Sequence, residues 1–155
     1  MNKLKIKEFI IAVLIPLAVG GIAGFLTRNS MEDYQKLNQP VIAPPGIVFP
    51  IVWTILFILM GIASYFVYIS TCKYGKTGLK VYAIQLVINF FFNILFFTFQ
   101  LFFISFLWTV LLLFVNLVMF QLFYKCNKTA GYLLIPYIAW NSFAVLLSFL
   151  VYTLN

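Results

Sequence analysis

Long uninterrupted apolar runs, separated by short polar segments, dominate the pattern of residues along this chain. The first run covers residues 9–27 and ends at Arg28, the second covers about 47–71, and the last covers about 130–154. Each is long enough to cross the roughly 30 Å hydrocarbon core of a bilayer as an α-helix, which needs about 20 residues. The pattern therefore predicts transmembrane helices rather than amphipathic helices of a water-soluble domain.

The longest apolar run, residues 81–124, contains no charged side chain. As one helix it would be about 66 Å long, roughly twice the thickness of the hydrocarbon core. Two helices, at about 80–100 and 103–124, account for it, and Gln100 and Ser105 supply polar groups at the break between them. The sequence thus predicts five membrane spans.

The amino-acid composition is also typical of a membrane protein. Apolar residues make up 65% of the 155 residues and charged residues 8%, against roughly 45–50% and 25% in soluble domains. The one substantial connection, the first loop at residues 28–45, is too polar to cross the membrane and too short for a separate domain. We therefore expect an all-α integral membrane protein, a single membrane domain over residues 1–155 that forms a five-transmembrane-helix bundle.

The formal charge of +7 comes from basic residues at the ends of the apolar runs. They form no basic face with interleaved aromatic residues, so nucleic acid is not an expected partner. With five spans, all but two of the 10 Lys and Arg residues fall on the N-terminal side of the membrane, and Arg28 and Lys36 fall on the other side. The positive-inside rule then predicts a cytoplasmic N-terminus, with the first loop and the C-terminus outside.

The N-terminal segment resembles a secretory signal peptide, because Lys3, Lys5 and Lys7 precede an apolar run. That run is longer than a typical signal core and does not end in a clear small-residue cleavage site. We therefore expect it to remain in the protein as the first span.

The two cysteines, Cys72 and Cys126, lie far apart in the sequence, and the chain has no histidine to complete a metal site. Both fall at the predicted cytoplasmic ends of their helices, where thiols stay reduced. We therefore expect no structural disulfide and interpret both cysteines as packing residues.

Polar side chains inside the spans are the residues most informative about function. In the third span Gln85, Asn89 and Asn93 recur every four residues, which places three amides on one helix face. Such amides either bond neighbouring helices or line a ligand cavity, and both interpretations stay open. In the fifth span, residues at helical spacing combine aromatic, polar and small side chains on one face: Tyr137, Trp140, Asn141, Ala144 and Ser148. We expect Trp140 to point into the bundle.

Several chemistries lack the residues that they need. The chain has no histidine, and its only carboxylate side chains, Glu8, Glu32 and Asp33, lie outside the spans. Acid–base catalysis, metal hydrolysis, proton-coupled transport and voltage sensing within the membrane are therefore not expected. A neutral cavity lined by aromatic and amide side chains suits a large, flat, mostly apolar ligand held by stacking and a few hydrogen bonds.

Three motifs in order along the chain resemble those of one known family. They are Ala43-Pro44-Pro45-Gly46-Ile47-Val48-Phe49-Pro50-Ile51-Val52-Trp53-Thr54, then Gln85-Leu86-x-x-Asn89 with Phe96-Phe97, then Pro136-Tyr137-Ile138-Ala139-Trp140-Asn141. With their spacing they resemble the TspO/translocator-protein family of tryptophan-rich sensory proteins, also called peripheral-type benzodiazepine receptors. The resemblance covers essentially the whole chain.

This resemblance implies a five-helix bundle, often a homodimer, in the lipid bilayer of a bacterial cell membrane. It implies no required cofactor and a pocket near the first loop for protoporphyrin IX, haem or isoquinoline-carboxamide ligands. The ligand-binding residues expected from it are Tyr34, Pro44, Phe49, Trp53, Phe57, Asn89, Phe92, Asn93, Tyr137, Trp140 and Ala144.

The function predicted from the residues and the resemblance together is that of a membrane-embedded tetrapyrrole-binding sensor or scavenger. Trp53 and Trp140 stack on the porphyrin or bond to it, Asn89 supplies an amide contact, and the first loop with Tyr34 forms the lid. Two alternatives stay open. One is light- and oxygen-dependent porphyrin degradation, with Trp53 and Trp140 as the catalytic residues, and the other is a passive carrier of porphyrins or lipids.

Overall fold

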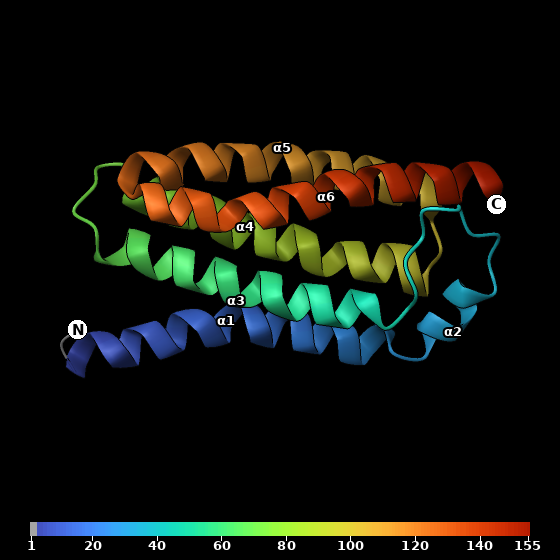
Figure 1. Ribbon diagram of the computed structural model, residues 1–155, viewed down its shortest axis with the longest axis horizontal. Helices are drawn as coiled ribbons and strands as arrows, with labels where there is room; N and C mark the ends of the chain where they lie inside the picture. Colours follow the sequence, from blue (N-terminus) through green and yellow to red (C-terminus); the bar gives the residue numbers. More distant parts are fainter. Residues whose placement is uncertain (1–2) are drawn as a thin grey trace.

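The computed structural model describes residues 3–155 as a bundle of helices without any strand in that range (Figure 1). The long helices are α1 (Lys3–Thr27), α3 (Val48–Ile69), α4 (Gly75–Asn93), α5 (Phe102–Cys126) and α6 (Lys128–Leu154). A short helix, α2 (Ser30–Gln35), lies in the first loop, and a π-helical turn, η1 (Ile94–Thr98), extends α4. The five spans are each long and apolar enough to cross a membrane. The predicted five-helix membrane protein is therefore confirmed.

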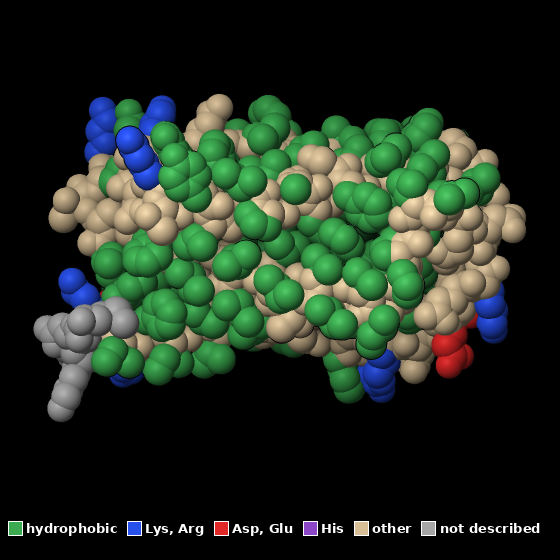
Figure 2. Space-filling model, viewed as in Figure 1, with side chains coloured by type: hydrophobic (Ala, Val, Ile, Leu, Met, Phe, Trp, Pro, Cys, Tyr) green, Lys and Arg blue, Asp and Glu red, His purple; other side chains and the backbone are tan. Residues whose placement is uncertain are grey.

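Neighbouring helices pack around the bundle in the order α1, α3, α6, α5 and α4, with α4 also contacting α1. The start of α1 lies at one end, together with the α3–α4 and α5–α6 turns, whereas α2 and the C-terminus lie at the other (Figure 1). Hydrophobic side chains cover the length of the face seen in Figure 2, and charged side chains lie toward its two ends. This distribution suits a bilayer around the middle of the bundle.

The predicted break in the longest apolar run occurs where the sequence placed it. The backbone of Gln100 has a φ of 53°, in the left-handed region, which reverses the chain direction after η1. The Leu101 backbone N–H donates to the Leu95 carbonyl at 3.0 Å and closes this turn, and α5 begins at Phe102. A polar, conformationally unusual residue thus separates the two spans.

The third span begins earlier than its apolar run does. We predicted a start near residue 80, whereas α4 begins at Gly75 and includes Lys76 and Lys80 in its first turns. Long lysine side chains can reach the membrane surface from within a helix end, so a charge does not mark the helix boundary. The fifth span likewise begins at Lys128, where the Asn127 side chain accepts a hydrogen bond from the Ala130 backbone N–H at 3.2 Å.

Helices α1 and α3 approach each other closely at Gly61. A Cβ atom at this position would lie 2.6 Å from Val13 Cα and 2.7 Å from the Ala12 carbonyl oxygen, so only glycine fits without moving the α1 backbone. The contact lies near the middle of both helices. This close approach fixes the spacing of α1 and α3 in the middle of the bundle.

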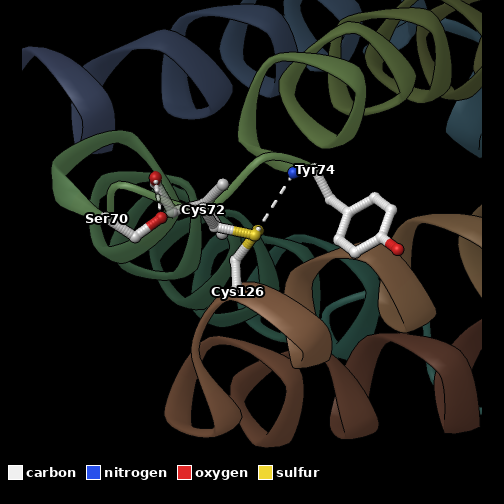
Figure 3. The surroundings of a disulfide bond; sticks show 5 residues. Ser70, Cys72, Tyr74 and Cys126 are labelled. Carbon is white, nitrogen blue, oxygen red and sulfur yellow. Dashed lines mark hydrogen bonds between the residues drawn. A yellow bond between two sulfur atoms is a disulfide. The ribbon is translucent and has the colours of Figure 1, made fainter.

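Cys72 in the α3–α4 turn and Cys126 at the end of α5 are joined by a disulfide (Figure 3). Their Cα atoms lie 5.2 Å apart, and the Tyr74 backbone N–H donates to Cys72 Sγ at 3.3 Å. The prediction that these cysteines form no disulfide and serve only as packing residues is therefore wrong. The 54 residues between them gave no sign that the bundle places the α3–α4 turn against the end of α5.

Candidate functional site

A cavity of about 680 Å³ lies between α1, α3 and the first loop. This volume falls within the range of roughly 300–1,000 Å³ that is typical of small-molecule sites. The α1 wall contains Gly20, Gly21 and Gly24, and the facing α3 wall contains Trp53 and Phe57. The cavity therefore has one smooth side and one aromatic side.

Glycines on α1 create much of this space. A Cβ atom at Gly21 or Gly24 would meet no other atom within 4 Å, whereas one at Gly20 would run into the Phe57 ring. At Gly20, α1 therefore packs directly against the Phe57 ring of α3. From Gly21 toward the first loop, α1 and α3 leave open space between them. The α1 wall at Gly21 and Gly24 therefore carries no side chain and has open space in front of it.

Trp53 forms the centre of the aromatic wall. Its ring stacks on Phe57, with ring centroids 5.5 Å apart and an interplanar angle of 27°. Phe49 and Phe97 continue this wall toward the first loop, with their centroids 6.1 Å apart in an edge-to-face arrangement. Such contacts hold the rings in fixed orientations and give a preorganised surface for stacking.

Trp140 lies on the other side of Trp53. The two rings meet edge to face with centroids 6.5 Å apart, so the structure does bring the two predicted tryptophans together. The space that they share is a void of only about 20 Å³, which Phe92, Phe96 and Ala144 also line. This volume holds little more than one water molecule. The open cavity borders Trp53 but not Trp140.

The three amide side chains on one face of α4, those of Gln85, Asn89 and Asn93, serve both roles expected for them. The Tyr137 hydroxyl donates to Gln85 Oε1 at 2.7 Å and accepts from Asn89 Nδ2 at 2.8 Å. All three side chains are buried, so Gln85 and Asn89 bond α4 to α6. Asn93, one turn further on, lines the cavity, and its Nδ2 donates to the Asn89 carbonyl at 3.1 Å.

A second amide pair connects α5 to α6. Asn116 Nδ2 donates to Asn141 Oδ1 at 2.7 Å, and Asn141 Nδ2 donates to the Thr109 carbonyl at 3.4 Å. Trp108 also serves packing, because its Nε1–H donates to the Ile88 carbonyl at 2.7 Å and so ties α5 to α4. The polar groups inside the bundle are mostly engaged with one another, and Asn93 is the amide of α4 that a ligand in the cavity can reach.

Tyr34 of α2 is buried at the first-loop end of the bundle, with 1% of its surface exposed. Its ring centroid lies 5.3 Å from that of Phe97 and 5.7 Å from that of Phe49. Burial raises the pKa of the Tyr34 hydroxyl to about 12. Tyr34 does not line the cavity but packs directly behind Phe49 and Phe97, which do.

The first loop is also held to the end of α6. Asn38 backbone N–H donates to Asn155 Oδ1 at 3.2 Å, and Asn155 Nδ2 returns a bond to the Asn38 carbonyl at 3.0 Å. Within the loop, Gln39 Nε2 donates to the Tyr34 carbonyl at 2.6 Å. These bonds fix the loop over the bundle end, and sequence patterns gave no indication of the Asn38–Asn155 pair.

The predicted site residues therefore fall into distinct places. The cavity is lined by Phe49, Trp53, Phe57 and Asn93. The small void is lined by Phe92, Trp140 and Ala144, together with Phe49 and Trp53. Tyr34, Asn89 and Tyr137 are buried, and Pro44 lies with Trp140 on a shallow groove between α3 and α6. Arg28, Gln35 and the α1 glycines also line the cavity, although they were not among the predicted site residues.

The described part of the chain contains no cluster of three or more His, Cys, Asp or Glu side chains that could hold a metal ion. The cavity contains one charged side chain, Arg28, and otherwise aromatic, aliphatic, glycine and neutral polar residues. The lining is therefore largely apolar and aromatic.

Comparison with known proteins identifies the family of this chain. The model of the TspO/MBR family matches residues 12–153. The chain is 38% identical to the "Tryptophan-rich protein TspO" of Chlorobaculum tepidum, over 100% of this chain and 99% of that protein. It is 31% identical to the "Tryptophan-rich protein TspO" of Archaeoglobus fulgidus, over 100% and 99%. It is 33% identical to the "Tryptophan-rich sensory protein" of Cereibacter sphaeroides, over 80% and 77%. The chain therefore belongs to the TspO/MBR family.

Proposed function

We propose that this protein binds a flat tetrapyrrole, such as protoporphyrin IX or haem, in the cavity between α1 and α3, and that it acts as a sensor or scavenger in the membrane. The observation that carries the proposal is the pairing of a glycine wall with an aromatic wall across a cavity of about 680 Å³. The name of the relative from Cereibacter sphaeroides, a sensory protein, fits such a role.

The residues around the cavity have distinct roles in this proposal. The Trp53 ring stacks on the macrocycle, and Gly21 and Gly24 let the opposite face of the ligand approach the α1 backbone. Asn93 supplies an amide for a polar group at the ligand edge. Tyr34 keeps Phe49 in place from behind and acts on the ligand through that ring.

We also propose that the lysine-rich end of the bundle faces the cytoplasm. The basic residues of the α3–α4 and α5–α6 turns lie at the same end as the start of α1, as the positive-inside rule requires. The Cys72–Cys126 pair lies at this end too, so a reducing compartment would open the bond and oxidation would close it. Labelling of the reduced cysteines with a membrane-impermeant maleimide in intact cells tests this orientation, because cytoplasmic thiols stay unlabelled until the cells are lysed.

Titration of protoporphyrin IX, followed by its Soret absorbance, tests ligand binding without relying on tryptophan emission. Replacing Trp53 by Phe keeps an aromatic ring but reduces the stacking area, so we expect about threefold to tenfold weaker binding. Trp140→Phe should have a smaller effect, because Trp140 contacts Trp53 but not the cavity. Trp108→Phe is the matched control and should bind as the wild type does. Equal affinity of the wild type and Trp53→Phe would refute the proposed site.

A further inference from the structure

Among the described residues that line the cavity, Arg28 is the only one with a charged side chain. It directly follows Thr27, the last residue of α1, and therefore lies at the first-loop end of the cavity. Its Nη1 donates to the Phe25 carbonyl at 2.7 Å, and its guanidinium carbon lies 3.8 Å from the centre of the Phe25 ring. These two contacts hold the guanidinium against Phe25, which does not itself line the cavity, so Arg28 lies at the edge of the cavity.

Most of the hydrogen-bonding capacity of Arg28 is unused. A guanidinium has five N–H donors in a planar fork, and only the bond to the Phe25 carbonyl engages one of them. Across the side chains of residues 5–155, no carboxylate forms an ion pair with Arg28, although Glu32 and Asp33 lie close by in the sequence. The remaining donors suit the two oxygens of an incoming carboxylate.

The rest of the cavity extends away from this charge into the bundle. Leu17, its deepest lining residue on α1, lies eleven residues before Arg28 in the sequence, which corresponds to about 16 Å along the helix. The walls there include the α1 glycines, Phe57 and Trp53. The cavity therefore combines a long apolar interior with a single cation at one end.

We infer that Arg28 recognises a carboxylate, and that the cavity selects flat apolar molecules that carry an acidic group on one edge. The inference rests on the proposed function, because it concerns the same cavity and names the class of ligand that it prefers. An anionic edge group would pair with the guanidinium at the first-loop end of the cavity, where water and lipid headgroups also lie, while the apolar body occupies the interior. An uncharged molecule of the same shape would gain nothing from Arg28.

Two porphyrins that differ only in charge provide the test. Protoporphyrin IX carries two carboxylates, and its dimethyl ester has the same macrocycle without them. Both are titrated into the full-length protein in an uncharged detergent and followed by Soret absorbance. The variants are Arg28→Gln, which removes the charge, Arg28→Lys, which keeps the charge without the planar fork, and Lys36→Gln, which removes a basic residue of the same loop outside the cavity.

We expect Arg28→Gln to weaken binding of the diacid about tenfold and to leave binding of the ester unchanged. Arg28→Lys should restore part of the lost affinity, and Lys36→Gln should change neither ligand. Equal losses for acid and ester in Arg28→Gln, or an equal loss of acid binding in Lys36→Gln, would overturn the inference while leaving the proposed function intact. If the wild type binds neither porphyrin, the proposed function fails and this inference fails with it.

Discussion

Replacing Gly24 by leucine tests whether the glycine wall of α1 provides the binding space. A Cβ atom at Gly24 would meet no other atom within 4 Å, and Gly24 lines the cavity, so we expect the new side chain to occupy cavity space without displacing a neighbour. Leucine is also a better helix former than glycine by up to about 1 kcal/mol. We therefore expect the free energy of unfolding to stay the same or to increase slightly.

Ligand binding should respond in the opposite direction. The leucine side chain would occupy space that the ligand needs, and overpacking of a fitted apolar site costs roughly 1–3 kcal/mol. That range corresponds to a loss of about 5- to 150-fold in affinity for protoporphyrin IX. Soret titration measures the affinity, and thermal unfolding in detergent measures the stability of the same sample.

Gly61→Leu is the matched control, because it makes the same substitution at a position without free space. A Cβ atom there would lie 2.6 Å from Val13 Cα, so α1 and α3 must separate, and we expect a clear loss of thermal stability. The reasoning is refuted if Gly24→Leu is folded and binds as tightly as the wild type. It is equally refuted if Gly24→Leu loses as much stability as Gly61→Leu.

Three further predictions concern the rest of the bundle. Replacing Cys72 and Cys126 by serine should lower the free energy of unfolding relative to the oxidised protein by up to about 4 kcal/mol, the chain-entropy value for a loop of 54 residues; reductant should remove the difference. Tyr34 should ionise near pH 12 in an ultraviolet difference titration against Tyr34→Phe. Burial of Tyr34 favours the neutral phenol in the folded protein. The contribution of Tyr34 to the free energy of unfolding is therefore complete below about pH 10 and is lost as the pH rises to about 12. Tyr34→Phe should lack this pH dependence. Tyr137→Phe should cost about 1–3 kcal/mol, since Gln85 loses the hydroxyl that donates to it; an unchanged melting temperature would contradict this.

The number of helices and the break between the third and fourth followed from the sequence because both depend on local properties. A span must match the membrane thickness, and the chain direction reverses at Gln100, near the predicted break. The partners of side chains inside the bundle could not be predicted in the same way. Periodicity placed Gln85 and Asn89 on one helix face, but their partner, Tyr137, lies on α6, 48 residues from Asn89 in the sequence. The disulfide was missed for the same reason.

The candidate site shows a similar division. The motif after the first loop identified Phe49 and Trp53, which do line the cavity. It could not show that Phe92 and Phe96 leave only a small void beside Trp53 and Trp140, because the packing of several helices decides which side of an aromatic ring stays open. Arg28 was assigned only to the membrane topology, since a charge at the end of an apolar run usually has that role.

The most direct measurement is a crystal structure of the protein in a lipid phase with protoporphyrin IX bound. We predict density for the macrocycle between the glycine wall of α1 and the Trp53 ring, with one acidic edge toward Arg28. Density between Trp53 and Trp140, with the surrounding phenylalanines displaced, would contradict this account. So would density on the outer surface of the bundle with the α1–α3 cavity empty.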